Sequence, residues 1–204
     1  MKDSRHHAFT LIELLVSIAI IAVLGGLAFA GAGSMLDRGN ATKCLASMRQ
    51  VGSAAHLFSS DNDLRLPGTS HGISWTNSLA AYLGPKFIGR CPSWPKHPAR
   101  ITYGWNDSLA DAQGNGIRAA SCRTPGQTMV LAELAIDQTS EHFHFAGGRG
   151  GAARVTPARF KAAVNVEAHG NGANYLFVDG HAENLPWAEV QRRLQQPGTT
   201  FLVP

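Results

Sequence analysis

An uninterrupted apolar run near the N-terminus dominates the pattern of hydrophobic and polar positions. The twenty residues from Leu14 to Gly33 include no charged residue and no proline. As an α-helix, a run of this length crosses the roughly 30 Å hydrocarbon layer of a bilayer. The run therefore predicts a membrane-spanning helix. One acidic residue, Glu13, directly precedes it, and a carboxylate in or near lipid is costly enough to indicate a dedicated partner.

Beyond Gly33 the pattern becomes that of an amphipathic helix. Small and apolar residues recur every three or four positions, and charged residues mostly lie off that face. The stripe comprises Ala41, Leu45, Met48, Gly52, Ala55 and Phe58. We predict one continuous helix from about Phe9 to Ser59, roughly 75 Å long at 1.5 Å per residue. The polar cluster that follows favours turns, so the helical segment is assigned to residues 9–62.

The remaining residues, 63–204, predict a globular α+β head with a small antiparallel sheet packed on the long helix. Strands are indicated by aromatic and β-branched runs, and helices by capping residues and Gly-Pro stops. The predicted strands are Ile101–Asn106, Thr128–Leu134, Asn174–Val178 and His181–Leu185, and the predicted helices run from Ser74 or Thr76 to Leu83 and from Trp187 to Gln195. Asp179-Gly180 predicts a tight two-residue hairpin with both turn residues at positive φ. The stretch Glu141–Gly172 is interpreted as a long surface loop.

The N-terminal residues carry a specific resemblance. A short basic leader precedes residues 8–14, which read Ala-Phe-Thr-Leu-Ile-Glu-Leu, and the apolar run follows. This arrangement resembles the class III signal of type IV pilins and type II secretion pseudopilins. The resemblance implies that a prepilin peptidase removes leader 1–8 by cutting between Ala8 and Phe9, methylates the Phe9 amine and leaves the helix in place. The family more often has Gly at the position of Ala8, and an uncleaved membrane anchor is the alternative.

Topology and partners follow from the same segment. Lys2 and Arg5 hold the N-terminus in the cytoplasm, because positive flanks of a first membrane helix resist translocation. The chain is then a single-pass inner-membrane protein with a periplasmic head that becomes part of an extracellular filament. Glu13 of one subunit pairs with the methylated Phe9 amine of a neighbour, since each charge alone is costly in an apolar core. The other expected partners are pilin or pseudopilin subunits.

A second resemblance concerns the head. His169 is followed after nine residues by Asp179-Gly180, which resembles the H-x(9)-D-G motif of pilin-like proteins abundant in planctomycete and verrucomicrobial bacteria. The same proteins tend to share further short matches, found here at Cys91-Pro92, Thr102–Asn106, Arg49–Gly52 and Pro67. The combined resemblance predicts a pilus or related filament subunit. The alternatives are a secretion pseudopilin and a non-polymerising membrane-tethered protein that binds a metal or a glycan.

The histidine and acidic residues of the head allow a structural interpretation, a metal-binding one, and a contact with a partner. In the structural one, Asp179 shapes the turn and His169 bonds the turn backbone, which fixes the hairpin against the long helix. In the metal-binding one, His169, Asp179 and His181 bind a transition metal, joined by His142 and His144, whose i, i+2 spacing favours one strand face. The structural interpretation is preferred, and no cofactor is predicted.

The three cysteines, Cys44, Cys91 and Cys122, are an odd number for an oxidising compartment. Cys91 and Cys122 both lie in the predicted head and could form a disulfide. Cys44 is interpreted as a buried free thiol on the long helix.

Charge and motif content exclude several function classes. The net charge of +4 is dispersed, which argues against nucleic acid as a partner. There is no Gly-x-Ser-x-Gly elbow, phosphate loop or His-Glu-x-x-His sequence. Glu133 lies near the end of a predicted strand and Asp137 follows it, so the two are not poised as an acid/base pair. We therefore predict that the chain is not an enzyme.

Overall fold

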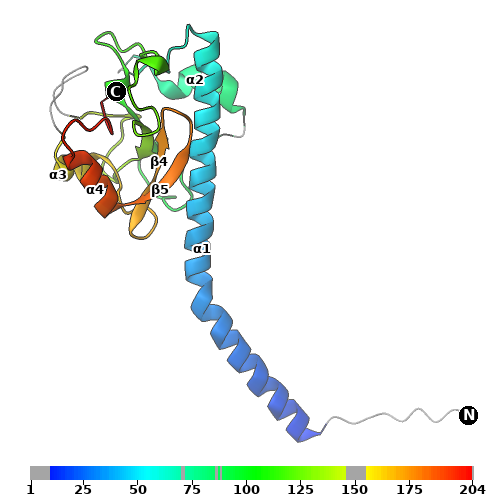
Figure 1. Ribbon diagram of the computed structural model, residues 1–204. Coiled ribbons are helices and arrows are strands. Elements are labelled where there is room, and N and C mark those ends of the chain that lie inside the picture. Colours follow the sequence, from blue (N-terminus) through cyan, green and yellow to red (C-terminus); the bar gives the residue numbers. More distant parts are fainter. Residues whose placement is uncertain (1–9, 70–71, 86, 88, 146–154, 204) are drawn as a thin grey trace, which may run out of the picture. The chain divides into compact units, whose positions relative to one another are not determined.

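The computed structural model describes residues 10–69, 72–85, 87, 89–145 and 155–203, without the side chains of residues 27–32 and 34. The chain divides into two compact units, Met1–Gly39 and Asn40–Pro204. Helix α1 (Leu11–Asp61) contributes residues to both (Figure 1). The predicted long N-terminal helix is confirmed, and it ends two residues beyond Ser59.

In the first unit, the apolar side chains of α1 are exposed. Leu11, Ile12 and Ile21 are 81%, 70% and 68% exposed, so the described large apolar side chains of this part of the helix are not buried within the chain. Within the described part of the chain, no helix combines the length and apolarity needed to cross a membrane. The predicted span Leu14–Gly33 includes residues 27–32, whose side chains are outside the described part, and it stays a prediction.

In the second unit, α1 packs one face against the head. Cys44, Met48 and Val51 of this face have no exposed surface, and they are spaced four and three residues apart as expected for one helix face. Leu45 and Phe58 of the predicted stripe are partly buried at its border. The predicted spacing of the buried positions is therefore correct. The buried face is rotated slightly from the predicted one, because Cys44 is fully buried and Leu45 is only partly buried.

The head is built on a five-stranded sheet in the order β3-β1-β2-β4-β5. The strands are β1 (Tyr103–Asn106), β2 (Met129–Glu133), β3 (His142–Phe143), β4 (Gly172–Phe177) and β5 (Ala182–Pro186). All neighbours pair antiparallel except β1 and β3, which are parallel. The predicted purely antiparallel sheet is thus wrong, since the sheet is mixed. The short strand β3 causes the difference, because both edges of β2 are taken and the chain after β2 adds to the free edge of β1.

Helices cover both faces of this sheet. The second half of α1 and helix α2 (Trp75–Leu83) lie on one side, and α3 (Pro157–Ala163) and α4 (Trp187–Gln195) lie on the other (Figure 1). Two short 3-10 helices, η1 (Asp107–Leu109) and η2 (Ala119–Ser121), come between β1 and β2 in the sequence. The bounds of α2 and α4 confirm the prediction. The predicted loop Glu141–Gly172 instead contains β3 and α3, and the signal for α3 was Thr156 as N-cap with Pro157 in the first turn.

The Asp-Gly hairpin has a three-residue loop where a two-residue turn was predicted. Gly180 N–H donates to the Phe177 carbonyl at 2.9 Å, and Phe177 N–H donates to the His181 carbonyl at 3.0 Å. Gly180 has φ +88°, whereas Asp179 is not among the described residues with positive φ. This is a type I turn followed by a left-handed glycine bulge. A Cβ on Gly180 would lie 2.5 Å from His56 Nε2 of α1, so the turn approaches the helix closely.

We predict opposite effects for two identical substitutions in α1. A Cβ at Gly52 would lie 2.9 Å from Leu176 Cδ1 and 3.0 Å from the Gly180 carbonyl oxygen, whereas a Cβ at Gly39 meets nothing within 4 Å. Gly52→Ala should lower the free energy of unfolding by about 1–2 kcal/mol through overpacking. Gly39→Ala should leave it unchanged or raise it by up to about 1 kcal/mol, because alanine favours helix. Urea unfolding of the purified chain measures both; stabilisation by Gly52→Ala would contradict this packing.

Candidate functional site

The N-terminal candidate residues begin with Ala8 and Phe9, which lie outside the described residues. The next ones form a reciprocal cap at the start of α1. Thr10 donates to Glu13 Oε2 from its backbone N–H at 2.9 Å and from its hydroxyl at 2.8 Å, and Glu13 N–H donates to Thr10 Oγ1 at 3.3 Å. This is a capping box, which satisfies two backbone donors at the helix start. The Glu13 carboxylate therefore has a local partner within the single chain.

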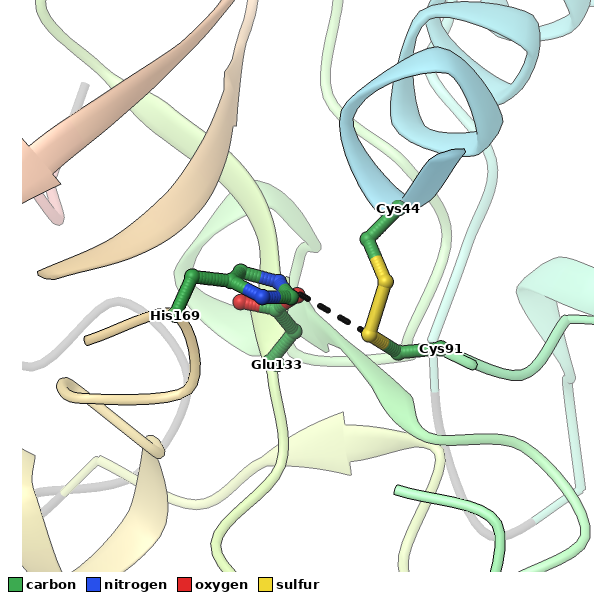
Figure 2. A group of neighbouring side chains, drawn as sticks. All are labelled: Cys44, Cys91, Glu133 and His169. Carbon is green, nitrogen blue, oxygen red and sulfur yellow. Dashed lines mark hydrogen bonds and ion pairs between the residues drawn. A yellow bond between two sulfur atoms is a disulfide. The ribbon is translucent and has the colours of Figure 1, made fainter. Parts of the chain in front are cut away.

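A second group of polar side chains is buried where α1 meets the head (Figure 2). It consists of Cys44, Cys91, Glu133 and His169, and one ligating atom from each lies within 4.8 Å of all the others. Cys44 and Cys91 form a disulfide with their Cα atoms 5.1 Å apart. His169 Nε2 lies 2.6 Å from Glu133 Oε1, and the two side chains are only 3% and 1% exposed. The group thus joins a covalent cross-link to a buried ion pair or charge-assisted hydrogen bond.

Each member is positioned by a different element. Cys44 is on the buried face of α1, and Glu133 is the last residue of β2. The backbone N–H of Cys91 donates to Thr102 Oγ1 at 2.7 Å. This bond holds the loop that carries Cys91 beside Thr102, the residue directly before β1. His169 lies three residues before β4, and its N–H donates to the carbonyl of Gly172, the first residue of that strand, at 2.9 Å. Four segments distant in sequence therefore meet at one point.

Further hydrogen bonds orient the two ionisable side chains. His169 Nδ1 lies 3.3 Å from Ser93 Oγ, and Glu133 Oε2 accepts the Asn174 backbone N–H at 3.1 Å. These contacts leave His169 Nε2 and Glu133 Oε1 facing each other, with Nε2 also 3.7 Å from Cys91 Sγ. The imidazole and the carboxylate are thereby fixed in rotation as well as position.

The negative charge of Glu133 affects two neighbouring tyrosines. Burial, and secondarily the charge of Glu133, raise the pKa of the Tyr103 and Tyr175 hydroxyls well above the ordinary value. Both side chains are fully buried. The surroundings of the pair are buried and aromatic, and removing one partner would leave the other ionisable group buried without its partner.

The disulfide corrects the cysteine predictions. Cys91 pairs with Cys44 and not with Cys122, and Cys122 is a buried free thiol. The prediction made Cys44 the free thiol because this residue belongs to the long helix, whereas the other two cysteines belong to the head, residues 63–204. The cross-link depends on which turn of α1 packs beside the loop at Cys91, and the sequence does not reveal that contact.

The structure also separates the predicted metal ligands. His169 precedes β4, whereas Asp179 and His181 lie beyond its other end, where Asp179 Oδ1 is 2.6 Å from His181 Nδ1. His169 therefore does not bond the hairpin turn, and the site His169, Asp179 and His181 is wrong. The rings of His142 and His144 are 4.5 Å apart, as their spacing suggested, but they do not belong to the His169 group. Within the described residues, no other such group of potential ligands converges.

Glu133 was the functional residue that sequence reasoning missed. It occupies a strand whose five positions are all buried, Met129–Glu133. A carboxylate in a fully buried strand requires a partner, so the signal was the acidic residue that ends an apolar strand. Its partner His169 lies 36 residues later in the sequence, and no sequence pattern links the two residues.

Comparison with known proteins identifies the N-terminal segment. Residues 3–29 match the family described as the prokaryotic N-terminal methylation motif. The match includes Ala8, Phe9 and Glu13 and supports a type IV pilin-like prepilin. It stops before the head, and the searches of curated proteins and of solved structures find no match. The H-x(9)-D-G resemblance therefore rests on the sequence alone.

We predict that Glu133→Ala destabilises the head far more than removal of an exposed carboxylate. The substitution leaves the imidazole of His169 buried without its partner, so it should lower the free energy of unfolding by about 3 kcal/mol. The control Glu167→Ala removes the partner of Lys161 from an ion pair whose side chains are about half exposed. It should cost less than about 1 kcal/mol. Equal losses in urea unfolding would contradict the assigned role of the buried pair.

Proposed function

We propose that the chain is a structural, pilin-like subunit of a type IV pilus or a related filament. Prepilin peptidase cuts its precursor between Ala8 and Phe9 and methylates the Phe9 amine. The observation that carries this proposal is the methylation motif matched over residues 3–29. It is supported by the helix that follows, whose apolar side chains in the first unit are exposed and so require a lipid or protein partner.

Assembly in this proposal depends on Glu13. In the single chain, Thr10 satisfies the carboxylate through its N–H and hydroxyl. After cleavage, the methylated amine of Phe9 carries a positive charge, and between apolar helices it gains most from a buried carboxylate. Glu13 of one subunit therefore pairs with Phe9 of a neighbour, and the capping contact to Thr10 holds the carboxylate until that neighbour arrives.

The proposed location is the inner membrane, with one pass, a cytoplasmic N-terminus and a periplasmic head before incorporation into an extracellular filament. The Cys44–Cys91 disulfide supports a head outside the cytoplasm, because disulfides persist in oxidising compartments. Lys2 and Arg5 support the orientation. The partners are prepilin peptidase, the membrane and other pilin-type subunits.

The proposal assigns no enzymatic role to the chain. The acid–histidine pair of the buried group is His169–Glu133, and its side chains are 3% and 1% exposed. A substrate would have no access to these atoms, and a catalytic base must come within hydrogen-bond distance of the proton that it removes. The pair is better suited to holding the head together.

A secretion pseudopilin remains the nearest alternative, since it would use the same processing and the same Glu13 pairing. Recovery of the protein in sheared surface filaments supports a pilus, whereas confinement to the cell envelope together with a secretion defect supports a pseudopilin. A non-polymerising tethered binding protein would show no crosslinks between the N-terminal helices of neighbouring copies.

We predict that Glu13→Ala is cleaved and membrane-bound but absent from filaments, because the neighbour's amine loses its partner. Thr10→Val is the matched control: it removes the hydroxyl of the capping box but keeps the carboxylate. It should weaken the helix start by about 1 kcal/mol and still assemble. Filament and membrane fractions, compared by immunoblot, measure both. Normal incorporation of Glu13→Ala, or equal loss in Thr10→Val, would rule out the amine pairing.

Mass spectrometry of the mature protein tests the processing. We expect an N-terminal peptide that starts at Phe9 and carries one methyl group on its amine. A chain that retains Met1–Ala8 in cells with active prepilin peptidase would show an uncleaved anchor and overturn the processing step.

A further inference from the structure

We propose that Cys44, Cys91, Glu133 and His169 form a structural zinc site when the disulfide is reduced. The cluster then has two alternative states, a disulfide beside a His-Glu pair and a four-ligand metal site. Both states connect α1 to the head at the same place. This inference does not depend on the filament function proposed above.

The positions of the four ligating atoms fit a tetrahedral metal with little movement. All four lie within 4.8 Å of one another. Zinc bound by two sulfurs, a nitrogen and an oxygen at the usual bond lengths spaces its ligands by roughly 3.3–3.8 Å. His169 Nε2 and Cys91 Sγ are already 3.7 Å apart. The 2.6 Å contact of Nε2 with Glu133 Oε1 must widen, and the two sulfurs must separate once their bond is broken.

The surrounding hydrogen bonds are those that metal ligands require. A metal-binding histidine usually bonds through its second ring nitrogen, and a ligating carboxylate is itself held by donors. Here His169 Nδ1 faces Ser93 Oγ at 3.3 Å, and Glu133 Oε2 accepts the Asn174 N–H at 3.1 Å. The atoms left for the metal, Nε2 and Oε1, both belong to the converging set. The orienting contacts therefore exist before any metal binds.

The ligand types favour zinc over hard cations. Two thiolates, one imidazole and one carboxylate suit Zn²⁺, whereas Ca²⁺ and Mg²⁺ prefer oxygen ligands. Cys44, Cys91 and Glu133 are at most 1% exposed, and the His169 side chain is 3% exposed. With four protein ligands and so little exposure, the site keeps no position for a substrate. It belongs with closed structural sites and not with catalytic ones.

The two states exclude each other, because the same sulfur atoms serve both. A dithiol reductant transfers two electrons and two protons to the Cys44–Cys91 bond, which gives two thiols and leaves the reductant as a disulfide. Zinc binding then releases the two thiol protons. The proton between His169 Nε2 and Glu133 Oε1 also leaves, and the neutral imidazole that binds zinc through Nε2 keeps its one ring proton on Nδ1, which faces Ser93 Oγ. A disulfide oxidant takes two electrons and two protons from the metal-free thiols and becomes two thiols, which restores the Cys44–Cys91 bond and the His169–Glu133 contact. An unoxidised chain would thus keep α1 attached to the head through the metal.

The test uses the purified full chain in detergent, reduced with a phosphine, which becomes a phosphine oxide with oxygen from water. After removal of the reductant under argon, the chain is titrated with Co²⁺ as a spectroscopic probe. We expect one equivalent to bind, with visible tetrahedral bands and a near-ultraviolet thiolate charge-transfer band, and Zn²⁺ to displace it. The oxidised chain should bind at least about 100-fold more weakly at this site, because both sulfurs are unavailable.

Variants separate this site from adventitious binding. Cys122→Ser, which alters the buried thiol outside the cluster, should leave the spectrum and stoichiometry unchanged. Cys44→Ser and His169→Ala should each change or abolish the spectrum. Ser93→Ala keeps all four ligands and should weaken binding about 10- to 100-fold, so it tests the site even if a ligand variant misfolds.

Several results would overturn the proposal. These are the absence of a one-equivalent site in the reduced chain, a cobalt spectrum without thiolate charge transfer, equal binding by the oxidised chain, or an unchanged spectrum in Cys44→Ser. Circular dichroism monitors folding throughout. A reduced chain that unfolds without metal and refolds with one equivalent would support the site, because binding energy then contributes to folding.

Discussion

The burial of the Glu133 carboxylate places the strongest single constraint on the head. A charge at 1% exposure is tolerated only with a partner and further hydrogen bonds. His169 supplies the partner at 2.6 Å, and Asn174 supplies a backbone N–H from β4. Satisfying this one side chain therefore fixes how β2, β4 and the segment before β4 meet.

The same point ties the head to α1. Asn174 uses its side chain to donate to the Ala41 carbonyl of the helix at 3.1 Å, and Cys44, one turn later, is disulfide-bonded to Cys91. At the other end of β4, the Asp179-Gly180 turn approaches Gly52 and His56. His169 and the Asp179-Gly180 turn thus act at separate places, at opposite ends of β4.

Helix α1 serves two physical roles along its length. From Cys44 onward, one face is buried in the core of the head. In the first unit, apolar side chains from Leu11 to Leu24 are exposed, and the capping box of Thr10 and Glu13 begins the helix. An exposed apolar segment that starts with a methylation motif is suited to a type IV pilin-like prepilin. The buried Cys44–Cys91 disulfide and the Glu133–His169 pair stabilise the head where α1 packs against it.

Local patterns in the sequence determined helices α1, α2 and α4, strands β1, β2, β4 and β5, and the N-terminal methylation motif. The bounds of α2 and α4, the period of α1 and the methylation motif all depend on residues within a few positions of one another, where capping and spacing act directly. The tertiary structure decided the parallel pairing of β3, the Cys44–Cys91 bond and the separation of His169 from Asp179. Each of these depends on which distant surfaces pack together, because side-chain burial joins segments that no local periodicity relates. Glu133 illustrates both contributions. Its place at the end of an apolar strand indicated that it needs a buried partner, and only the packing of the sheet identified that partner as His169.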